Sequence, residues 1–596
     1  MPFLTPGLAF LGRGLTYFTV YMGSAYYAIT TIASGHGVEV PAWVVIAGAI
    51  VAAPVFGRLY VFIRYQRQKR RAAALGARVF PKAVGAWPGN LDILKDSLKN
   101  LEIGYPGDGL EKTTDIVGYA FNLDIMYSDL IFTACPEHLK TMLATDFQNY
   151  VKGERFQEGM GSVLGTGVFN SDGDMWKFHR SITRPVFTRD RIADFDLFDR
   201  HSDQVLVKLK ERLREGHAID FQDLMLRFTI DTATEFLFGN CVHALSAGLP
   251  YPPKAAYVPP QQQDPAGRIA NEFSAAFLRS QEIISVRERS GWLWPLSEIW
   301  EDKTIEPMKV VNAYLEPIIH EAVERRKNTL PNEDKQAEKE SEDNQTLLDS
   351  LMDATMDPRV LRDEILNIMI AGRDTTAATL TFAVYLLSQH PIVFQRLRSE
   401  ILEKIGPNRR PSFEDLKELK YLRAVLNETL RLFPVVPFNV RESINEAVWP
   451  SPDPSKKPLY VPPGTKTAYS VFVMHRRTDL WGPDAEEYDP DRFLDDRLQK
   501  YLVKNSFIFL PFNAGPRICL GQQFAYNEMS FMMIRLLQTF SEFTLDLASG
   551  PDEATPPAAW GAAPGRKATE KVWPKMHLTM YANGGLWIKM KESDSV

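Results

Sequence analysis

Phe512-Asn-Ala-Gly-Pro-Arg-Ile-Cys-Leu-Gly521 is the stretch that decides the fold. Its Gly-Pro pair predicts a tight loop, and its single cysteine, Cys519, comes just before residues 522–540, whose apolar spacing predicts a buried helix. A thiol at a helix start lies beside free backbone N–H groups and the positive end of the helix dipole, which favour the thiolate. A thiolate held in a rigid loop is a metal ligand or a nucleophile, and the simpler alternative is a buried free cysteine.

The composition narrows the class of protein. The chain has 596 residues, of which 45% are hydrophobic and 24% charged, as in ordinary globular proteins. Its net charge of −6 provides no basic surface for nucleic acid, so we expect no nucleic-acid partner. The three cysteines, Cys135, Cys241 and Cys519, cannot form a disulfide framework, which indicates a reducing compartment.

The N-terminal segment has the composition of a membrane anchor. Residues 42–57 carry no charge, and with residues 59–63 they approach the roughly twenty apolar residues that a span needs, interrupted only by Arg58. Five basic residues follow within residues 64–71, and such a cluster stays in the cytosol together with the chain behind it. Residues 15–33 form a weaker stretch that is either a second span or an interfacial helix. We therefore expect an anchor over residues 1–71 with its span at about 42–63, and one catalytic domain over residues 72–596.

The rest of the chain is predicted to be mainly helical with small β-sheets. Asp357-Pro358 is a helix start, and the apolar pattern that follows runs to Leu387, before Pro391. This helix should cross the core because it is apolar on several faces. Strand patterns are few and late, at 459–461, 507–510 and 543–547, with a hairpin of 575–581 and 586–590 around Asn583-Gly-Gly.

Punctuated stretches predict connections rather than core. Residues 80–88 contain Pro and Gly and are predicted to be a linker between anchor and domain. Three inserts have compositions that cannot bury a core, so we expect exposed, mobile loops at 249–265, 328–345 and 550–567.

The middle of the long helix carries Ala371-Gly-Arg-Asp-Thr-Thr376, whose Gly, Asp and Thr are poor helix formers. Gly372 would let a flat ligand approach the backbone, and the hydroxyl of Thr375 can bond the carbonyl one turn earlier. The carboxylate of Asp374 can pass protons. The alternative is a solvated polar kink without chemistry.

Two motifs together resemble one family. The pattern Phe-x-x-Gly-x-Arg-x-Cys-x-Gly at 512–521 matches in full the haem-ligand loop of the cytochrome P450 family of haem-thiolate monooxygenases, and residues 371–376 resemble that family's oxygen-activating motif. The resemblance extends from about residue 80 to the C-terminus and implies the cytochrome P450 fold and haem b (iron protoporphyrin IX). It implies that Cys519 ligates the iron as thiolate. It also implies that Thr375 stabilises the bound dioxygen and that Asp374 takes part in proton delivery.

The same resemblance implies residues around the haem. Trp176 and Arg180 match a Trp-x-x-x-Arg element, Arg441 follows at a position that often holds a propionate, and Arg517 and Phe512 belong to the ligand loop. Buried propionates need guanidinium or similar donors. Taken singly, each arginine is equally compatible with an ordinary surface position.

A further set is implied to be structural. Glu428 and Arg431 lie three residues apart on one helix face and match the family's Glu-x-x-Arg helix, with Arg492 as the third member. Outside this context such a pair is usually a surface ion pair. His179 is also expected to be structural.

Residues 231–239 and 512–519 look like the fungal n-alkane and fatty-acid hydroxylase branch, which implies oxidation of long aliphatic chains near the terminal carbon. The chain has no flavin or dinucleotide fingerprint, so electrons would come from a separate NADPH-dependent cytochrome P450 reductase. The other partners implied are O2, a hydrophobic small molecule and membrane lipid, in the endoplasmic reticulum membrane with the catalytic domain cytosolic. The alternatives are oxidation of aromatic xenobiotics or secondary metabolites, haem binding without turnover, and an inactive membrane scaffold.

Overall fold

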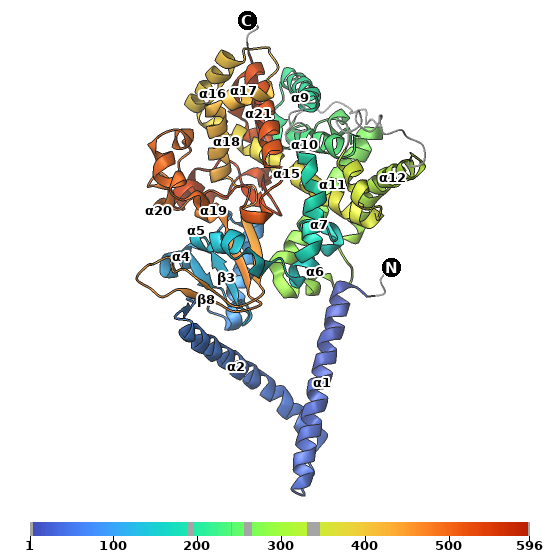
Figure 1. Cartoon of the computed structure of the whole chain (residues 1–596), viewed down its shortest axis with the longest axis vertical. Coiled ribbons are helices and arrows are strands. Elements are labelled where there is room, and N and C mark those ends of the chain that lie inside the picture. Colours follow the sequence, from blue (N-terminus) through green and yellow to red (C-terminus); the bar gives the residue numbers. More distant parts are fainter. Residues whose placement is uncertain (1–3, 188–194, 240, 256–264, 330–345, 594–596) are drawn as a thin grey trace.

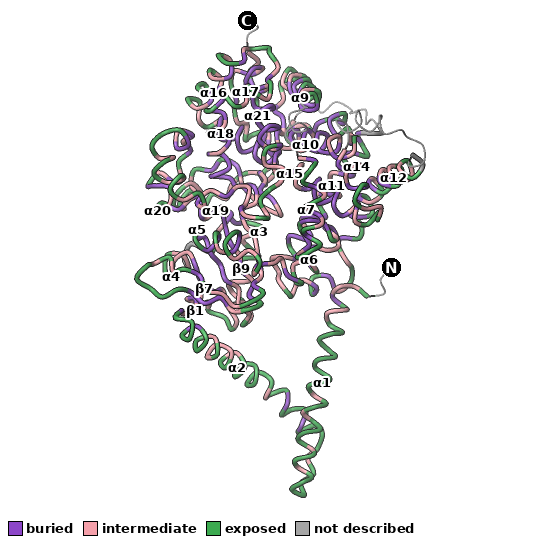
Figure 2. Tube along the Cα trace, in the orientation of Figure 1, coloured by how far each residue is buried: buried purple, intermediate pink, exposed green. Residues whose placement is uncertain are grey.

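The structure is a computed structural model that describes residues 4–593 except 188–194, 240, 256–264 and 330–345. Two N-terminal helices, α1 (Pro6–Gly35) and α2 (Ala42–Ala74), project from the main body and are largely exposed (Figures 1 and 2). Among the described residues, α2 is the one unbent helix long and apolar enough to cross a membrane, and it contains the predicted span. The predicted second span lies in α1, which is not among the helices apolar enough to cross a membrane and packs on α2, where the Tyr21 hydroxyl donates to the carbonyl of Ala49.

The junction between anchor and body is part of the folded core. Helix α2 continues through the basic cluster, so the predicted boundary after residue 71 falls inside a helix. The linker predicted at 80–88 is wrong, because Phe80 and Ala83 are buried. Strand β1 (Arg78–Val79), just before it, pairs in parallel with β8 (Leu459–Val461). The rest of the segment is irregular and partly exposed, including Val84 and Trp87.

Helix α15 (Pro358–Gln389) forms the centre of the body, as predicted (Figure 1). The side chain of Asp357 accepts a hydrogen bond from the N–H of Arg359 and caps the first turn, and most of the helix is buried. Helix α10 (Phe221–Phe238) packs along α15. Helices α18 (Lys420–Leu432) and α21 (Gln522–Thr539) pack against α15 and complete this core.

Shorter and peripheral helices surround this core. Their bounds are α3 (Leu91–Ile103), α4 (Glu111–Val117), α5 (Pro136–Lys140), α6 (Glu154–Leu164), α7 (Gly173–Thr183), α9 (Asp196–Arg214), α11 (Pro265–Ser290), α12 (Ile305–Thr329), α14 (Leu347–Ala354), α16 (Pro391–Lys404), α17 (Phe413–Glu418), α19 (Val471–Met474) and α20 (Thr478–Trp481).

The strands form small sheets, so the predicted fold class is confirmed. The largest sheet has the order β2 (Ala120–Asn122), β3 (Leu130–Thr133), β9 (Lys466–Ser470), β6 (Phe438–Ser443), β4 (Tyr150–Val151). Strand β7 (Ala447–Trp449) pairs with β8, so that β1, β8 and β7 form a second sheet in that order. The remaining strands are β10 (Phe540–Leu545) with β13 (Trp587–Glu592) and β5 (Ile219–Asp220), and the pair β11 (Pro574–Met576) with β12 (Met580–Ala582).

Two strand predictions are wrong. Residues 506–508 form a 3-10 turn because the Asn505 side chain accepts from the N–H of Phe507. The predicted hairpin around Asn583 does not form: β12 pairs with β11 across a turn at 577–579, whereas β13 pairs with β10 and β5. The Asn-Gly-Gly turn therefore connects two different sheets. Strand β13 lies beside β10, where its residue Ile588 is buried in the core.

The insert at 550–567 is mostly exposed or half-buried, as its composition predicts, but one of its side chains packs into the body. Its Trp560 is buried, with its ring centroid 5.4 Å from that of Tyr105 and 5.7 Å from that of Trp573. Lys567 pairs with Asp108 at 2.7 Å. Residues 256–264 and 330–345 of the other two inserts lie outside the described residues.

Candidate active site

The loop that carries Cys519 is built by backbone hydrogen bonds and one required glycine. The N–H of Cys519 donates to the carbonyl of Phe512 at 3.0 Å, and the N–H of Ile518 donates to the carbonyl of Gly515. Gly515 has φ = +68°, and a Cβ there would lie 1.6 Å from the carbonyl oxygen of Leu143. Helix α21 begins three residues after Cys519, at Gln522. The predicted arrangement of loop, cysteine and helix is therefore present.

The environment of the Cys519 thiol differs from the expectation of a helix-stabilised thiolate. Burial raises the pKa of Cys519, and the N–H of Gly521 and the charge of Arg180 oppose that rise without cancelling it. The effect of burial is the largest, because removing a thiolate from water costs more free energy than one N–H and one neighbouring positive charge supply. A bound metal cation removes this penalty, since a coordinating thiol is deprotonated. The site thus suits a metal ligand better than a free nucleophile.

Cys519 faces an internal cavity of about 1600 Å³, which is also lined by Ala371, Gly372 and Thr375 of α15. The cysteine is exposed to this cavity although it lies deep in the protein. A Cβ on Gly372 would come within 3.3 Å of the Cβ of Ala233, so this glycine also allows α10 to approach α15 closely. The segments 160–169 and 435–438 each contribute apolar lining residues. The structure thus brings together the ligand loop and the acid–alcohol motif around one space.

Within α15, the two predicted catalytic side chains have different surroundings. The hydroxyl of Thr375 donates to the carbonyl of Ala371 at 2.6 Å, as predicted from its place in the helix. Asp374 is buried, accepts from Arg373 at 3.1 Å, and is not among the residues that line the cavity. Its second oxygen, Oδ2, has no hydrogen-bond partner among the described residues. The carboxylate thus keeps one oxygen available for a proton-carrying water.

The predicted propionate ligands converge on one wall of the cavity. Trp176 and Arg180 of α7, Arg441 of β6 and Arg517 of the ligand loop all line it. Arg517 donates to the carboxylate of Asp172 at 2.7 Å, and its guanidinium lies 4.5 Å from the ring centroid of Trp176. Burial, together with the charges of Arg441 and Arg180, lowers the pKa of Arg517 to about 10. These cations repel one another across the cavity wall.

Lys152 belongs to the same wall, although its sequence context gave no signal. It directly follows β4, whose antiparallel register with β6 pairs Val151 with Glu442 and so brings Lys152 level with Arg441. Burial and the charges of Arg441 and Arg517 lower the pKa of Lys152 well below its usual range. Only the strand pairing reveals this residue, because 289 positions separate it from Arg441, its neighbour on β6.

These residues fit a bound haem. The Nε atoms of Arg441 and Arg517 are buried and have no hydrogen-bond partner within the described part of the chain. Two propionates would accept from such donors and relieve the repulsion among the cations. Phe512, whose ring centroid lies 5.1 Å from that of Tyr526, provides an apolar side to the same space. The donor set therefore matches a flat apolar ligand with two carboxylates and a metal that takes a thiolate.

The three residues predicted to be structural are buried together behind this site. Arg431 pairs with Glu428 at 2.6 Å, and the Nε of Arg492 lies 3.6 Å from the same carboxylate. None of the three lines the cavity. His179 is fully buried and contacts Glu364 at 2.8 Å, which agrees with a structural role.

Comparisons with known proteins agree with this geometry. The family model for cytochrome P450 matches residues 106–563. Cytochrome P450 52A3-A of Candida maltosa is 35% identical over 515 residues, which cover 85% of this chain and 89% of that protein. Cytochrome P450 52-M1 of Starmerella bombicola is 36% identical over 451 residues, 73% of this chain and 80% of the relative. Cytochrome P450 monooxygenase himC of Aspergillus japonicus is 35% identical over 484 residues, 81% of this chain and 78% of the relative.

Members of this family bind haem through an axial cysteine thiolate and use O2, a redox partner and a hydrophobic substrate. With the family model matching most of the chain and a relative aligned over 85% of it, the assignment is direct. The chain belongs to the cytochrome P450 family of haem-thiolate monooxygenases.

Proposed function

We propose that this monooxygenase hydroxylates long aliphatic chains, alkanes or fatty acids, near the terminal carbon. The observation that carries the proposal is the large cavity shared by Cys519 and Thr375, to which the segments 160–169 and 435–438 contribute apolar residues. The likeness of residues 231–239 to the n-alkane and fatty-acid hydroxylase branch supports the same substrate class.

The site residues divide into those that hold the cofactor and those that serve the reaction. We propose that Cys519 is the axial ligand and that Arg180, Arg441, Arg517 and Trp176 hold the propionates. When bound, the haem supplies oxygen activation, which the thiolate assists by pushing electron density toward the iron. Phe512 would provide an apolar side chain next to the haem in the same cavity.

We propose that Thr375 and Asp374 deliver protons to the reaction. The hydroxyl of Thr375 lies at the cavity wall, where its oxygen can accept a hydrogen bond or, by turning from the carbonyl of Ala371, donate one into the cavity. Asp374 has a free Oδ2 that can pass protons from solvent toward Thr375. Arg373 holds the other oxygen and fixes the orientation of the carboxylate.

The protein is further proposed to reside in the endoplasmic reticulum membrane, with α2 as a span and the catalytic domain in the cytosol. The basic end of α2 supports this orientation, and a separate NADPH-dependent cytochrome P450 reductase would supply electrons. Removal of residues 1–63 should release much of the protein from membranes. Full protection of the domain from protease in sealed microsomes would contradict the orientation.

The function is tested with microsomes that contain the protein and a reductase. We expect NADPH-dependent hydroxylation of dodecane or dodecanoic acid, and a reduced carbon-monoxide spectrum of the thiolate type. Cys519→Ser should lose that spectrum, whereas Cys135→Ser, a buried cysteine outside the cavity, should keep it. A thiolate-type spectrum in Cys519→Ser would refute the ligand, and turnover confined to aromatic compounds would refute the substrate class.

A further inference from the structure

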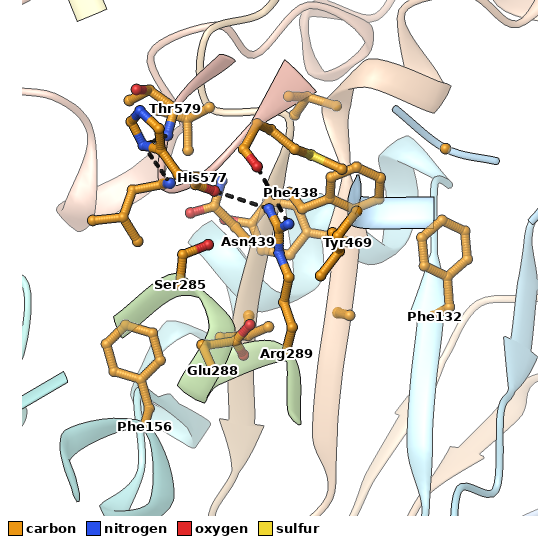
Figure 3. A pocket seen from close by; sticks show the side chains of 18 of the residues that line it. Phe132, Phe156, Ser285, Glu288, Arg289, Phe438, Asn439, Tyr469, His577 and Thr579 are labelled. Atoms are coloured by element: carbon orange, nitrogen blue, oxygen red, sulfur yellow. Dashed lines mark hydrogen bonds between the residues drawn. The ribbon is translucent and has the colours of Figure 1, made fainter. Parts of the chain in front are cut away.

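Arg289 places a positive charge in the cavity wall away from the haem cations. It lies in the last turn of α11 and lines the cavity, and Figure 3 shows its guanidinium beside the turn between β11 and β12. Its Nη2 donates to the carbonyl of His577 at 2.9 Å and its Nη1 to the carbonyl of Met576 at 3.4 Å. Backbone acceptors therefore fix the orientation of the guanidinium without neutralising its charge.

No carboxylate of the described residues lies within 4.0 Å of the Arg289 guanidinium. The adjacent Glu288 is engaged elsewhere, since it pairs with Lys466 of β9 at 2.6 Å. Burial lowers the pKa of Arg289, and the charges of Glu288 and Tyr581 only partly offset this. A buried guanidinium without a counter-ion is costly, and an anionic ligand would remove that cost.

Arg289 is electrostatically separate from the group that faces the propionates. The charges that lower the pKa of Arg517 are those of Arg441 and Arg180, and neither acts on Arg289. Lys152 stands between the two groups, because it is influenced by Arg441 and Arg517 on one side and by Glu288 on the other. The propionates would therefore be satisfied without Arg289, which leaves its charge for another ligand.

The surroundings of Arg289 are those of an amphipathic ligand site. Ser285, one turn earlier on the same face of α11, also lines the cavity and offers a second donor. The wall in Figure 3 also contains the aromatic side chains Phe132, Phe156 and Phe438, together with the polar residues Glu288, Asn439, His577 and Thr579. A site of this kind suits a molecule with one carboxylate and a long apolar remainder.

We propose that Arg289, assisted by Ser285, binds the carboxylate of a fatty-acid substrate, so that this enzyme prefers fatty acids to alkanes of equal length. The proposal rests on the proposed function of aliphatic hydroxylation and adds the residue that selects among such substrates. A guanidinium suits the task because its parallel N–H groups match both carboxylate oxygens. The bound carboxylate would compensate the charge of Arg289, which Glu288 offsets only in part.

The test compares binding of dodecanoate, methyl dodecanoate and dodecane to the haem-loaded full-length protein at pH 7.5, followed by the substrate-induced shift of the haem absorbance. Wild type should bind the acid most tightly. Arg289→Met should weaken dodecanoate binding by about ten- to a hundredfold, the range for a charge-assisted hydrogen bond, and leave the ester and alkane unchanged. Arg289→Lys should recover part of the loss.

The control variant is Lys82→Met, because Lys82 also lines the cavity but already pairs with Asp124 at 2.7 Å. It should leave the binding of all three probes unchanged. Equal weakening of acid and ester in Arg289→Met would mean a structural role and overturn the proposal, as would unchanged acid binding. If Arg289→Met fails to retain haem, the same comparison is made with Arg289→Gln, which keeps N–H donors but removes the charge, and for which an unchanged preference for acid over ester overturns the proposal. Failure of wild type to bind any probe would instead overturn the proposed function.

Discussion

Gly515 of the ligand loop lies against the backbone carbonyl of Leu143, so closely that a Cβ on Gly515 would stand 1.6 Å from that oxygen. Leu143 is buried in the segment Thr141–Thr145, which forms a single irregular turn after α5. The loop that carries Cys519 therefore packs directly against the main chain of Leu143, which cannot move aside as a flexible side chain could. The position of the cysteine depends on this contact as much as on the turn itself.

We predict that Gly515→Ala abolishes haem incorporation. The substitution forces a backbone clash in addition to the strain of φ = +68°. Gly464→Ala is the matched control, because Gly464 has φ = +64° with open space around its Cβ position. The measurement is the haem-to-protein ratio of the purified variants. Similar losses in both would show that strain alone, without the clash, is responsible.

We predict that breaking the buried ion pair between Glu428 and Arg431 causes a large loss of stability. In Glu428→Gln the guanidinium groups of Arg431 and Arg492 lose their buried counter-charge, which costs about 3–5 kcal/mol when one partner of a buried pair is removed. Denaturant unfolding followed by tryptophan fluorescence measures the loss. The control is Asp491→Asn, whose ion pair with Arg396 is exposed and should contribute less than about 1 kcal/mol. Equal losses would contradict this division.

We predict that the buried carboxyl of Glu528 makes the protein less stable as the pH rises. It is buried on α21, and burial raises its pKa from 4.5 to about 8, with Thr376 and Thr232 opposing this. The folded state therefore holds a proton that the unfolded state releases above its ordinary pKa, so the free energy of unfolding falls as pH rises from about 4.5 to 8. The share lost over that window is on the order of 4 kcal/mol.

Glu528→Gln should remove this share of the pH dependence. The difference in melting temperature between variant and wild type should shift in favour of the variant as pH rises from 5 to 8. Differential scanning fluorimetry at several pH values is the measurement. A difference that stays constant over the range would mean that the carboxyl of Glu528 is ionised in the folded protein.

The sequence predicts those parts of the molecule that a local pattern specifies. The cap at Asp357, the glycine-dependent loop at 512–521 and the hydrogen bond of Thr375 each depend on residues a few positions apart. Lys152 and Arg289 could not be found in this way, because their roles depend on which strand or turn packs beside them. The failed hairpin has the same cause: Asn583-Gly-Gly predicts a turn correctly but says nothing about which sheet receives the next strand.

The composition of a segment does not show where one of its side chains is buried. Residues 550–567 lack the apolar content of a core segment and are mostly exposed or half-buried, yet Trp560 is buried between Tyr105 and Trp573. Likewise, residues 80–88 were predicted to be a linker, although Phe80 and Ala83 are buried. Burying one large aromatic ring contributes more than the average hydrophobicity of a window conveys.

The last prediction concerns Thr375, whose hydroxyl donates to the carbonyl of Ala371 and lines the cavity. Thr375→Ala should leave haem content and substrate binding close to those of wild type, because only a side chain hydroxyl and a methyl group are lost. Product formation per NADPH should fall and hydrogen peroxide should rise. Loss of one positioned donor or proton relay costs on the order of a hundredfold in the step it serves, and a water that replaces the hydroxyl would reduce this.

The control for this variant is Thr379→Ala. Thr379 lies one turn later on α15, makes the same type of hydrogen bond, to the carbonyl of Thr375 at 2.8 Å, and does not line the cavity. It should leave the ratio of product to NADPH unchanged, because its hydroxyl has access only to the helix backbone. If Thr375→Ala also leaves that ratio unchanged, its hydroxyl serves only the helix, and the proton path must start from Asp374 through water. If both variants uncouple equally, the cause is the geometry of α15 rather than a donor at the cavity.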